Sequence, residues 1–305
     1  MYDLIGDIHG HVEPLKQVLT LMDYKPVKGV WQHPNRKVIF AGDFIDRGPA
    51  IREVLQIVRA MVDAGQAMAI MGNHEYNALA YAYALPDGKY LRSHSATNTR
   101  QHQATLDQFK HHREEWQDCL QWFYTLPLFL DLGTLRVVHA CWDDEHISWL
   151  KNNNHERLSE QLLLSSHNQG TYPFEVMEET LKGKEFNIPE SFAWHDKDGH
   201  LRNANRIKWW IHPGIATYGD FLFNCPENLR HEKVPTDLKV SIYPKEAPPV
   251  FFGHYWMDEE FPIIQADNVI CLDYSIAKGG SLVAYRWKGE DKLDTAHFLS
   301  VKGGE

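Results

Sequence analysis

Two carboxylates and an arginine stand close together in one short run, which reads Gly42-Asp43-Phe44-Ile45-Asp46-Arg47-Gly48. The run follows an apolar stretch, residues 38–41, with the pattern of a short buried strand, and a helical pattern begins after Pro49. This much charge does not suit a core, and its natural partners are a metal ion and an anionic group. A strand-end turn held by a structural Asp–Arg pair is the alternative for this run alone.

The same order of strand, glycine, polar ligands and helix occurs twice more. Gly6-Asp7-Ile8-His9-Gly10 follows an apolar run at residues 2–5, and Gly72-Asn73-His74-Glu75 follows an apolar run at residues 67–71. Open α/β folds place their ligands at one edge of the sheet, beyond the carboxyl ends of the strands. We therefore expect the polar side chains of the three runs to meet at one edge of one sheet.

Two later strand patterns end in a histidine. His139 follows the apolar run 135–138, and Gly253-His254 follows the apolar run 250–252. A lone histidine at such a place is usually structural. Here, however, several candidate ligands arrive at the same sheet edge.

These five motifs occur in the order found in the calcineurin-like metallophosphoesterases, and the GDFIDRG and GNHE forms resemble the phosphoprotein phosphatase branch, bacterial type. The resemblance covers about residues 1–140 and 248–287. It implies an α/β fold, the four-layer α/β/β/α sandwich of that superfamily. We expect a single domain over residues 1–305, with a variable insertion at about residues 143–248 that shapes substrate entry.

The resemblance also implies a site for two divalent metal ions. The expected ligands are Asp7 and His9 for the first ion, Asn73, His139 and His254 for the second, and Asp43 between the two. This mixed oxygen and imidazole set suits manganese, iron or zinc better than calcium, and manganese is our first choice. A pair of ions about 3.5–4 Å apart offsets the charge of a phosphoryl group and supplies hydroxide at neutral pH.

Further residues take roles in catalysis and substrate binding by the same resemblance. Arg47 would hold two phosphate oxygens, His74 would be the general acid, and Asp46 would orient its ring. A second cation is expected from a basic and aromatic cluster in the insertion, with Arg206 as the candidate and His212 as the alternative. A tryptophan-rich core strand with a solvated basic face would also explain this cluster, which comprises Arg202, Arg206, Lys208, Trp209, Trp210 and His212.

We predict a metal-dependent phosphoesterase that hydrolyses phosphomonoesters, including those of phosphoproteins, by direct attack of a metal-bridging hydroxide. The alternative is a hydrolase of dinucleoside polyphosphates such as diadenosine tetraphosphate. Asp46 favours the first, because symmetric diadenosine tetraphosphatases often lack that acid, whereas the run at residues 252–256 favours the second. A binding protein without turnover would have lost the acid or the bridging ligand, and this chain keeps both.

Composition sets the limits of this hypothesis. The 305 residues are 43% hydrophobic, which is enough for a sizeable core, and the net charge of -10 argues against general nucleic-acid binding. The sequence shows no basic and apolar leader and no apolar run of about 18 residues, so we expect a cytoplasmic protein without membrane contact. The cysteines are scattered and are expected to be reduced, at positions Cys119, Cys141, Cys225 and Cys271.

Two segments are expected to carry no chemistry. A long charged helix is predicted from Thr99 to about Tyr124. An acidic run that contains Asp144 and His146 is predicted to be a loop facing water. The histidines in or near the long helix are expected to be solvated or packed on its face, namely His94, His102, His111 and His112.

Overall fold

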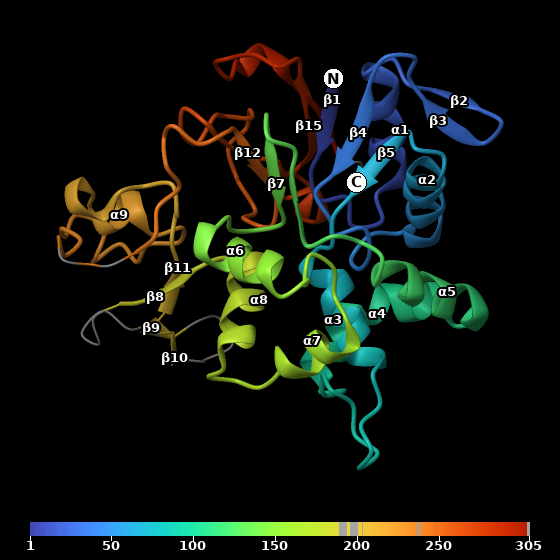
Figure 1. Ribbon diagram of the computed structural model, residues 1–305, viewed down its shortest axis with the longest axis horizontal. Helices are drawn as coiled ribbons and strands as arrows, with labels where there is room; N and C mark the ends of the chain where they lie inside the picture. Colours follow the sequence, from blue (N-terminus) through green and yellow to red (C-terminus); the bar gives the residue numbers. More distant parts are fainter. Residues whose placement is uncertain (189–193, 196–200, 203, 237, 239, 304–305) are drawn as a thin grey trace.

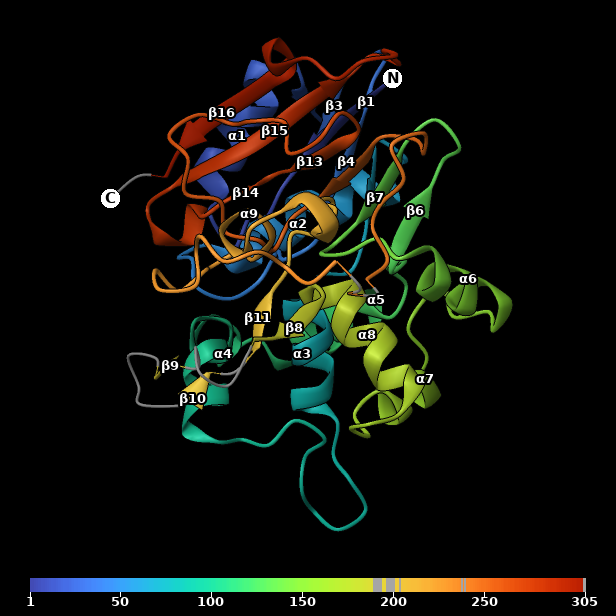
Figure 2. The same cartoon turned by 90° about the vertical axis from the view of Figure 1, so that its left-hand side faces the viewer.

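Figure 1 shows the computed structural model of the chain, which describes residues 1–188, 194–195, 201–202, 204–236, 238 and 240–303. Two main β-sheets lie next to each other, and most of the helices between residues 73 and 182 gather below them in this view. The turned view in Figure 2 shows the same separation of sheets above and helices below.

The first sheet contains the strands that carry the three N-terminal motifs. Its strands β1, β4 and β5 are parallel, and β15 runs antiparallel to β1. The order is β14 (Asp273–Tyr274), β15 (Ser281–Trp287), β1 (Tyr2–Ile5), β4 (Lys37–Phe40) and β5 (Ala67–Ala69), and β16 (Phe298–Lys302) also pairs with β15. Because β1, β4 and β5 are parallel neighbours, the polar runs that follow them emerge at the same sheet edge.

The helices beside this sheet follow the predicted apolar spacing. Helix α1 (Val12–Leu21) and helix α2 (Ile51–Asp63) bury the residues that recur every three or four positions. A short hairpin of β2 (Lys25–Val27) and β3 (Val30–Gln32) connects α1 to β4.

The second sheet carries the two histidine motifs. Its order is β13 (Val269–Cys271), β12 (Val250–Phe252), β7 (Arg136–Val138) and β6 (Phe129–Asp131). The two sheets face each other through aromatic side chains, and the ring centroids of Phe251 and Tyr285 lie 5.3 Å apart. The chain crosses between the sheets at Leu272, so the ends of β7 and β12 reach the loops that follow β1 and β4.

The predicted single helix over residues 99–124 is wrong. Three helices follow β5, namely α3 (Asn73–Ala82), α4 (Ala96–Phe109) and α5 (Arg113–Phe123). The break between α4 and α5 lets the Trp116 ring lie 4.8 Å from the Phe109 ring. In one straight helix these two positions would be about 10 Å apart, so the break buries two rings against each other.

The predicted loop facing water is also wrong at His146. Asp143 caps helix α6 (Asp144–Asn152) by accepting hydrogen bonds from the backbone N–H groups of Glu145 and His146. The cap turns His146 into the protein, where it is buried, while Asp144 stays exposed.

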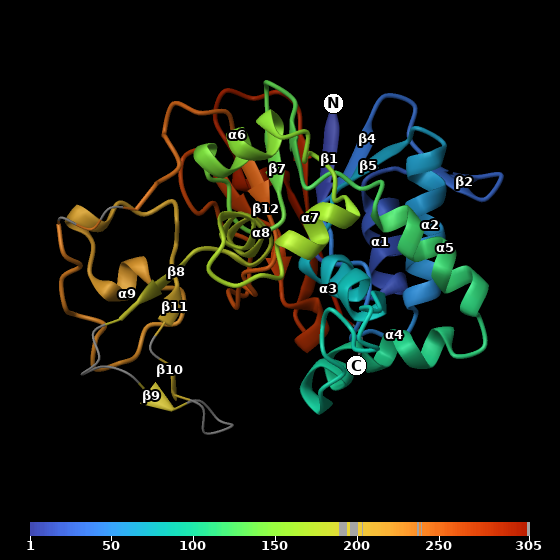
Figure 3. The same ribbon diagram turned by 60° about the horizontal axis from the view of Figure 1, so that its bottom comes forward.

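The rest of the proposed insertion mixes helices and short strands. Figure 3 shows helix α9 and strands β8 to β11 set to one side of the two sheets. The elements are α7 (Glu160–Ser165), α8 (Tyr172–Lys182), β8 (Glu185–Asn187), β9 (Trp194–His195), β10 (Leu201–Arg202), β11 (Ala204–Arg206) and α9 (Tyr218–Phe221). The division into one domain and an insertion stays a prediction. Among the described residues, no helix has both the length and the apolar character needed to cross a bilayer.

Candidate metal centre

The Asp43 carboxylate lies between two histidines from different sheets. One of its oxygens is 3.6 Å from His9 Nε2, and the other is 3.4 Å from His139 Nε2. All three side chains are buried. The loops that follow β1, β4 and β7 therefore converge, and a carboxylate with one imidazole on each oxygen can link two adjacent cations.

Asn73 and His254 complete the second half of this centre. The Asn73 Oδ1 atom lies 2.9 Å from His139 Nε2 and 2.7 Å from His254 Nδ1. Ligand atoms about 2.1 Å from one metal ion and at right angles to each other are about 3 Å apart. These three side chains are therefore spaced like neighbouring ligands of a single ion.

Several buried polar atoms in the centre have no hydrogen-bond partner among the described residues. They include Asp7 Oδ1 and His9 Nε2. The His9 Nδ1–H group donates to the Ile45 carbonyl at 2.9 Å, which leaves a lone pair on Nε2. Burial and the neighbouring His74 lower the pKa of His9 to about 3, so the ring is neutral and suited to bind a metal.

The centre concentrates negative charge in a buried place. Burial, followed by the charges of Asp273 and Asp43, raises the pKa of Asp7 well above its usual value. Burial and the Asp43 charge also raise the pKa of Glu75 to about 7. Such mutual repulsion is relieved by bound cations, and these carboxylates and imidazoles fit a divalent metal.

Glu75 connects two of the motifs, a role that the sequence did not reveal. Its Oε2 accepts hydrogen bonds from the backbone N–H groups of Asp43 and Gly72, and its Oε1 accepts one from Phe44. Gly72 is needed here because a Cβ at this position would collide with Asp43. The Glu three residues after a helix N-cap was the signal that could have predicted this contact.

The backbone is strained at the same positions. Among the described non-glycine residues with positive φ are His9 at 45°, Asp43 at 52°, Asp46 at 66°, Arg47 at 67° and His254 at 67°. Each such conformation costs on the order of 1–3 kcal/mol and persists only where the surroundings enforce it. The strain therefore marks the loops that aim these side chains.

Next to the metal centre, His74 and Asp46 form a buried pair. The His74 Nδ1–H group donates to Asp46 Oδ2 at 2.6 Å, and His74 Nε2 lies 3.9 Å from Asp43. Burial alone would lower the pKa of His74, but the Asp43 charge and the bond to Asp46 outweigh burial and raise it. Nε2 can therefore carry a proton on the side that faces the metal centre.

His102 and Thr105 hold the other oxygen of Asp46. His102 Nδ1–H and the Thr105 hydroxyl donate to Asp46 Oδ1 at 2.7 and 2.6 Å, and both side chains are buried. The His102 ring packs near the rings of Tyr81 and Trp116, as the face-packed alternative predicted, but its bond to Asp46 was not predicted. Burial would raise the pKa of Asp46, but the bonds from His102 and His74 outweigh burial and lower it.

Arg47 points out of this buried centre and is exposed. Its guanidinium carbon lies 4.3 Å from the centroid of the Trp256 ring, and the Lys278 ammonium lies 3.4 Å from that centroid. Within the described part of the chain, the Arg47 guanidinium makes no ion pair. It is therefore stacked in place and open to an anion.

Arg206, and not His212, approaches the metal centre. Burial and the Arg206 charge lower the pKa of His254 well below its usual value, and the Arg206 guanidinium lies 5.1 Å from the Tyr255 ring. His212 is exposed and caps a short 3-10 helix by accepting from the Gly214 N–H. The side chain of Arg202 lies outside the described residues.

A third group of potential metal ligands lies in the insertion, at Asp143, His146 and Glu179. The Lys184 ammonium already fills this group, 2.6 Å from Asp143 Oδ2 and 3.3 Å from Glu179 Oε2. An internal cation thus balances these carboxylates, and we assign no metal there. Among the cysteines, Cys119, Cys141 and Cys271 are buried, Cys225 is partly buried, and all four are free thiols.

Residues 2–236 match the family model described as calcineurin-like phosphoesterase, which is more than half of the chain. The chain belongs to the calcineurin-like phosphoesterase family. It is accordingly a hydrolase that acts on phosphoester bonds, and its fold is the mixed α/β sandwich of this family. The family uses divalent metal ions, and two of the histidine and aspartate groups that could hold one share Asp43.

Named relatives include two kinds of bis(5'-nucleosyl)-tetraphosphatase. A symmetrical enzyme from Vibrio cholerae is 27% identical over 317 residues, covering 97% of this chain and 96% of its own. An asymmetrical enzyme from Oceanobacillus iheyensis is 32% identical over 139 residues, which is 45% of this chain and 54% of the relative. The first match spans nearly the whole phosphoesterase chain, and the second about half the length of that relative.

Solved structures similar to this phosphoesterase include a putative diadenosine tetraphosphatase and a protein serine/threonine phosphatase from Saccharomyces cerevisiae. The first has 14% identity and a TM-score of 0.48, and covers 99% of this chain and 93% of its own. The second has 15% identity and a TM-score of 0.49, and covers 100% of this chain and 79% of its own.

Proposed function

We propose that this chain hydrolyses phosphoesters with two divalent metal ions, manganese before iron or zinc. The supporting observation is the Asp43 carboxylate set between His9 and His139, beside buried ligand atoms without partners. The proposed ligands are Asp7 and His9 for one ion, Asn73, His139 and His254 for the other, and Asp43 for both. When bound, the two ions supply positive charge for the phosphoryl oxygens and lower the pKa of a water molecule.

The side chains around the centre then bind the phosphate and move a proton. Arg47 holds two phosphate oxygens with its planar guanidinium, and Trp256 keeps that guanidinium in place. Arg206 adds a second positive charge from the insertion. His74 gives the proton on Nε2 to the leaving oxygen, while Asp46 accepts the hydrogen bond from Nδ1 and fixes the ring.

The proton donor supports phosphomonoesters, including phosphoproteins, as substrates. An alkoxide is a poor leaving group and needs a proton, whereas a nucleotide leaves without one more readily. The buried His74–Asp46 pair with its bond of 2.6 Å provides that proton.

Dinucleoside polyphosphates are the second proposed substrate class. The observation in their favour is the similarity to the symmetrical tetraphosphatase of Vibrio cholerae, which extends over 97% of this chain. Either substrate places one phosphate against Arg47, so the two proposals share one centre and differ in what lies beyond it.

A substrate panel tests these proposals. The purified chain is assayed with manganese on an aryl phosphate, on serine-, threonine- and tyrosine-phosphorylated peptides, and on diadenosine tetraphosphate. We expect turnover that a chelator removes and that His74→Asn lowers by about 10²- to 10⁴-fold. An exposed aspartate in a surface loop provides the control, Asp87→Asn, which should keep full activity. Absence of chelator-sensitive turnover on every substrate would reject the proposed function.

A further inference from the structure

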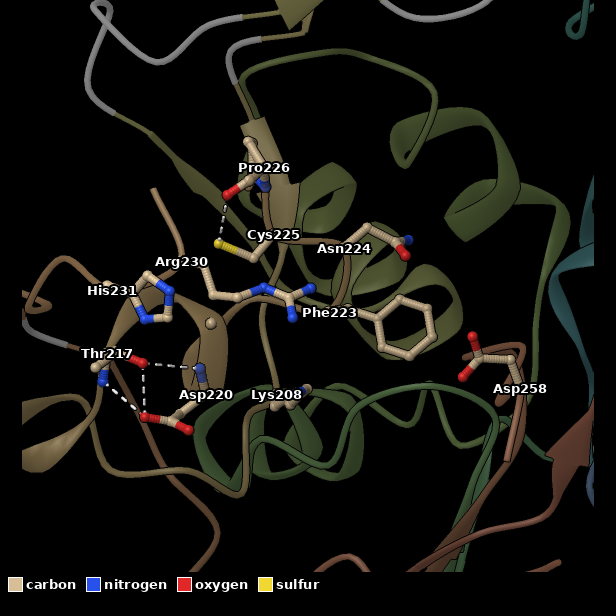
Figure 4. Close-up of a pocket in the computed structure, with 11 residues that line it drawn as sticks. Lys208, Thr217, Asp220, Phe223, Asn224, Cys225, Pro226, Arg230, His231 and Asp258 are labelled. Carbon is tan, nitrogen blue, oxygen red and sulfur yellow. Dashed lines mark hydrogen bonds between the residues drawn. The ribbon is translucent and has the colours of Figure 1, made fainter. Parts of the chain in front are cut away.

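A large cavity lies in the insertion, next to helix α9. Its volume is about 740 Å³, and its lining includes Lys208, Phe223, Arg230 and His231. Figure 4 shows the Arg230 guanidinium extending toward the middle of this cavity, with Lys208 below it and the Phe223 ring beyond it. None of the proposed metal ligands lines it.

This cavity adjoins a second one, with which it shares part of its lining. The second cavity has a volume of about 690 Å³ and shares Phe223, Asn224 and Asp258 with the first. Its lining also includes Trp256, the residue that stacks on Arg47. We name the two cavities together the distal groove. It extends from the ring beside the phosphate-binding arginine to the cations near α9.

Phe223 also connects the distal groove to residues beside the metal centre. Its ring lies 5.2 Å from the ring of Tyr255, the residue after His254. Its backbone N–H donates to the carbonyl of Arg206 at 2.8 Å. A molecule that contacts Phe223 is therefore one side chain away from the residues proposed to bind the scissile phosphate.

The far end of the distal groove is suited to an anion. Lys208 is partly buried there, and its ammonium makes no hydrogen bond or ion pair within the described residues. Burial lowers the pKa of Lys208, because the buried ammonium lacks the solvent that it has in water. In the part of the chain that the structure describes, Arg230 pairs with Glu227 alone, with its Nε atom 3.4 Å from Glu227 Oε2.

The charges of Asp220 and Glu259 act on Lys208, but neither carboxylate forms an ion pair with its ammonium within the described residues. Asp220 is engaged by Thr217, whose backbone N–H and hydroxyl donate to it at 2.9 and 2.7 Å. Asp258 is exposed and lies on the opposite side of Figure 4 from Arg230. The unpaired Lys208 ammonium and the Arg230 guanidinium thus remain available to a ligand.

We infer that the distal groove binds a nucleoside phosphate, the part of a dinucleoside polyphosphate that lies beyond the scissile phosphate. Lys208 and Arg230 bind its phosphate oxygens, and the Phe223 ring packs against its base. This inference rests on the proposed function and selects the longer of its two substrate classes. A small phosphomonoester held at Arg47 lacks the further phosphate and the base that these side chains would bind.

Kinetics on a long and a short substrate test the inference. The variants Lys208→Gln and Arg230→Gln are assayed with manganese on diadenosine tetraphosphate and on para-nitrophenyl phosphate. Losing one charge-assisted contact should raise KM for diadenosine tetraphosphate about tenfold, with kcat little changed. Both constants for para-nitrophenyl phosphate should stay at the wild-type values. Lys245→Gln is the control, since Lys245 is exposed and lines neither cavity.

The possible outcomes separate the inference from the proposed function. If the wild-type chain cleaves para-nitrophenyl phosphate or a phosphopeptide but not diadenosine tetraphosphate, the inference is wrong and the proposed function stands. If both substrates are cleaved and the variants change KM for both or for neither, the inference is also wrong. Should Lys208→Gln lower the melting temperature, Phe223→Leu and Arg230→Gln decide the matter, because both must raise KM for the long substrate alone.

Discussion

The metal centre and the distal groove differ in the kinds of charged side chain that they contain and in how firmly these are held. In the centre, carboxylates and imidazoles are buried, hydrogen-bonded by backbone groups and held by strained loops, as at Asp43. In the groove, Lys208 and Arg230 lie outside the helices and strands of the insertion and, within the described residues, have few partners. A reaction needs fixed ligand geometry, whereas recognition of a long substrate needs accessible charge. We therefore expect changes in the centre to affect turnover of every substrate, and changes in the groove to affect only long ones.

Removing the shared carboxylate should have the largest effect. Asp43→Asn takes away the negative charge between His9 and His139, so both ions should bind more weakly. Loss of a supporting side chain costs about 10- to 100-fold in metal affinity, and loss of a direct ligand should cost at least about 100-fold. Metal content of the purified protein, measured by mass spectrometry, checks this alongside activity. Wild-type metal content in Asp43→Asn would contradict the ligand assignment.

The next effect separates the acid from the metal ligands. His74→Asn should lower kcat by about 10²- to 10⁴-fold for phosphomonoesters with an alcohol leaving group, such as phosphoserine peptides, while the metal content stays unchanged. The loss should be smaller for a substrate whose leaving group needs no proton. Equal losses on para-nitrophenyl phosphate and on an alkyl phosphate would contradict a proton-donor role, since the alkyl alcohol depends far more on the acid.

A third change tests the residues that hold Asp46. His102→Phe removes the bond of 2.7 Å to Asp46 Oδ1 but leaves the His74 ring in place. Residues that orient a functional side chain through a hydrogen bond typically contribute about 10- to 100-fold to activity, so we expect a loss of that size in kcat, at constant metal content. The effect should vanish in a His74→Asn background, because both residues act through one proton donor. Additive losses in the double variant would show that His102 acts in another way.

The smallest expected effect lies at the border between the two regions. Trp256→Leu removes the ring that stacks on Arg47. A cation–π contact at an exposed site contributes about 0.5–1 kcal/mol, so KM should rise roughly 2- to 5-fold. Because Arg47 serves both substrate classes, the rise should be the same for para-nitrophenyl phosphate and diadenosine tetraphosphate. A rise confined to the long substrate would show that Trp256 acts only through the distal groove that it lines and does not hold Arg47.

Local sequence patterns were sufficient for much of this protein. Each N-terminal motif is a short apolar run, a glycine and one or two ligands, and neighbouring parallel strands bring such runs to one sheet edge. The helical pattern after Pro49 likewise predicts helix α2, which the structure has at Ile51–Asp63. These features depend on residues close together in the chain, so the sequence alone indicates them, together with the family and the class of reaction.

The partners of these motifs were decided only by the tertiary structure. His102 and Thr105 meet Asp46 from positions 56 and 59 residues away, on a helix whose pattern gives no sign of that contact. The break between α4 and α5 is also a feature of the tertiary structure. It brings Trp116 back onto Phe109, and it comes from packing and not from a helix-breaking residue. The distal groove likewise exists only because Lys208, Phe223 and Trp256 are folded around one space. Spacing along a chain fixes which face of an element a residue occupies, but which residue meets it across space depends on how all the elements pack.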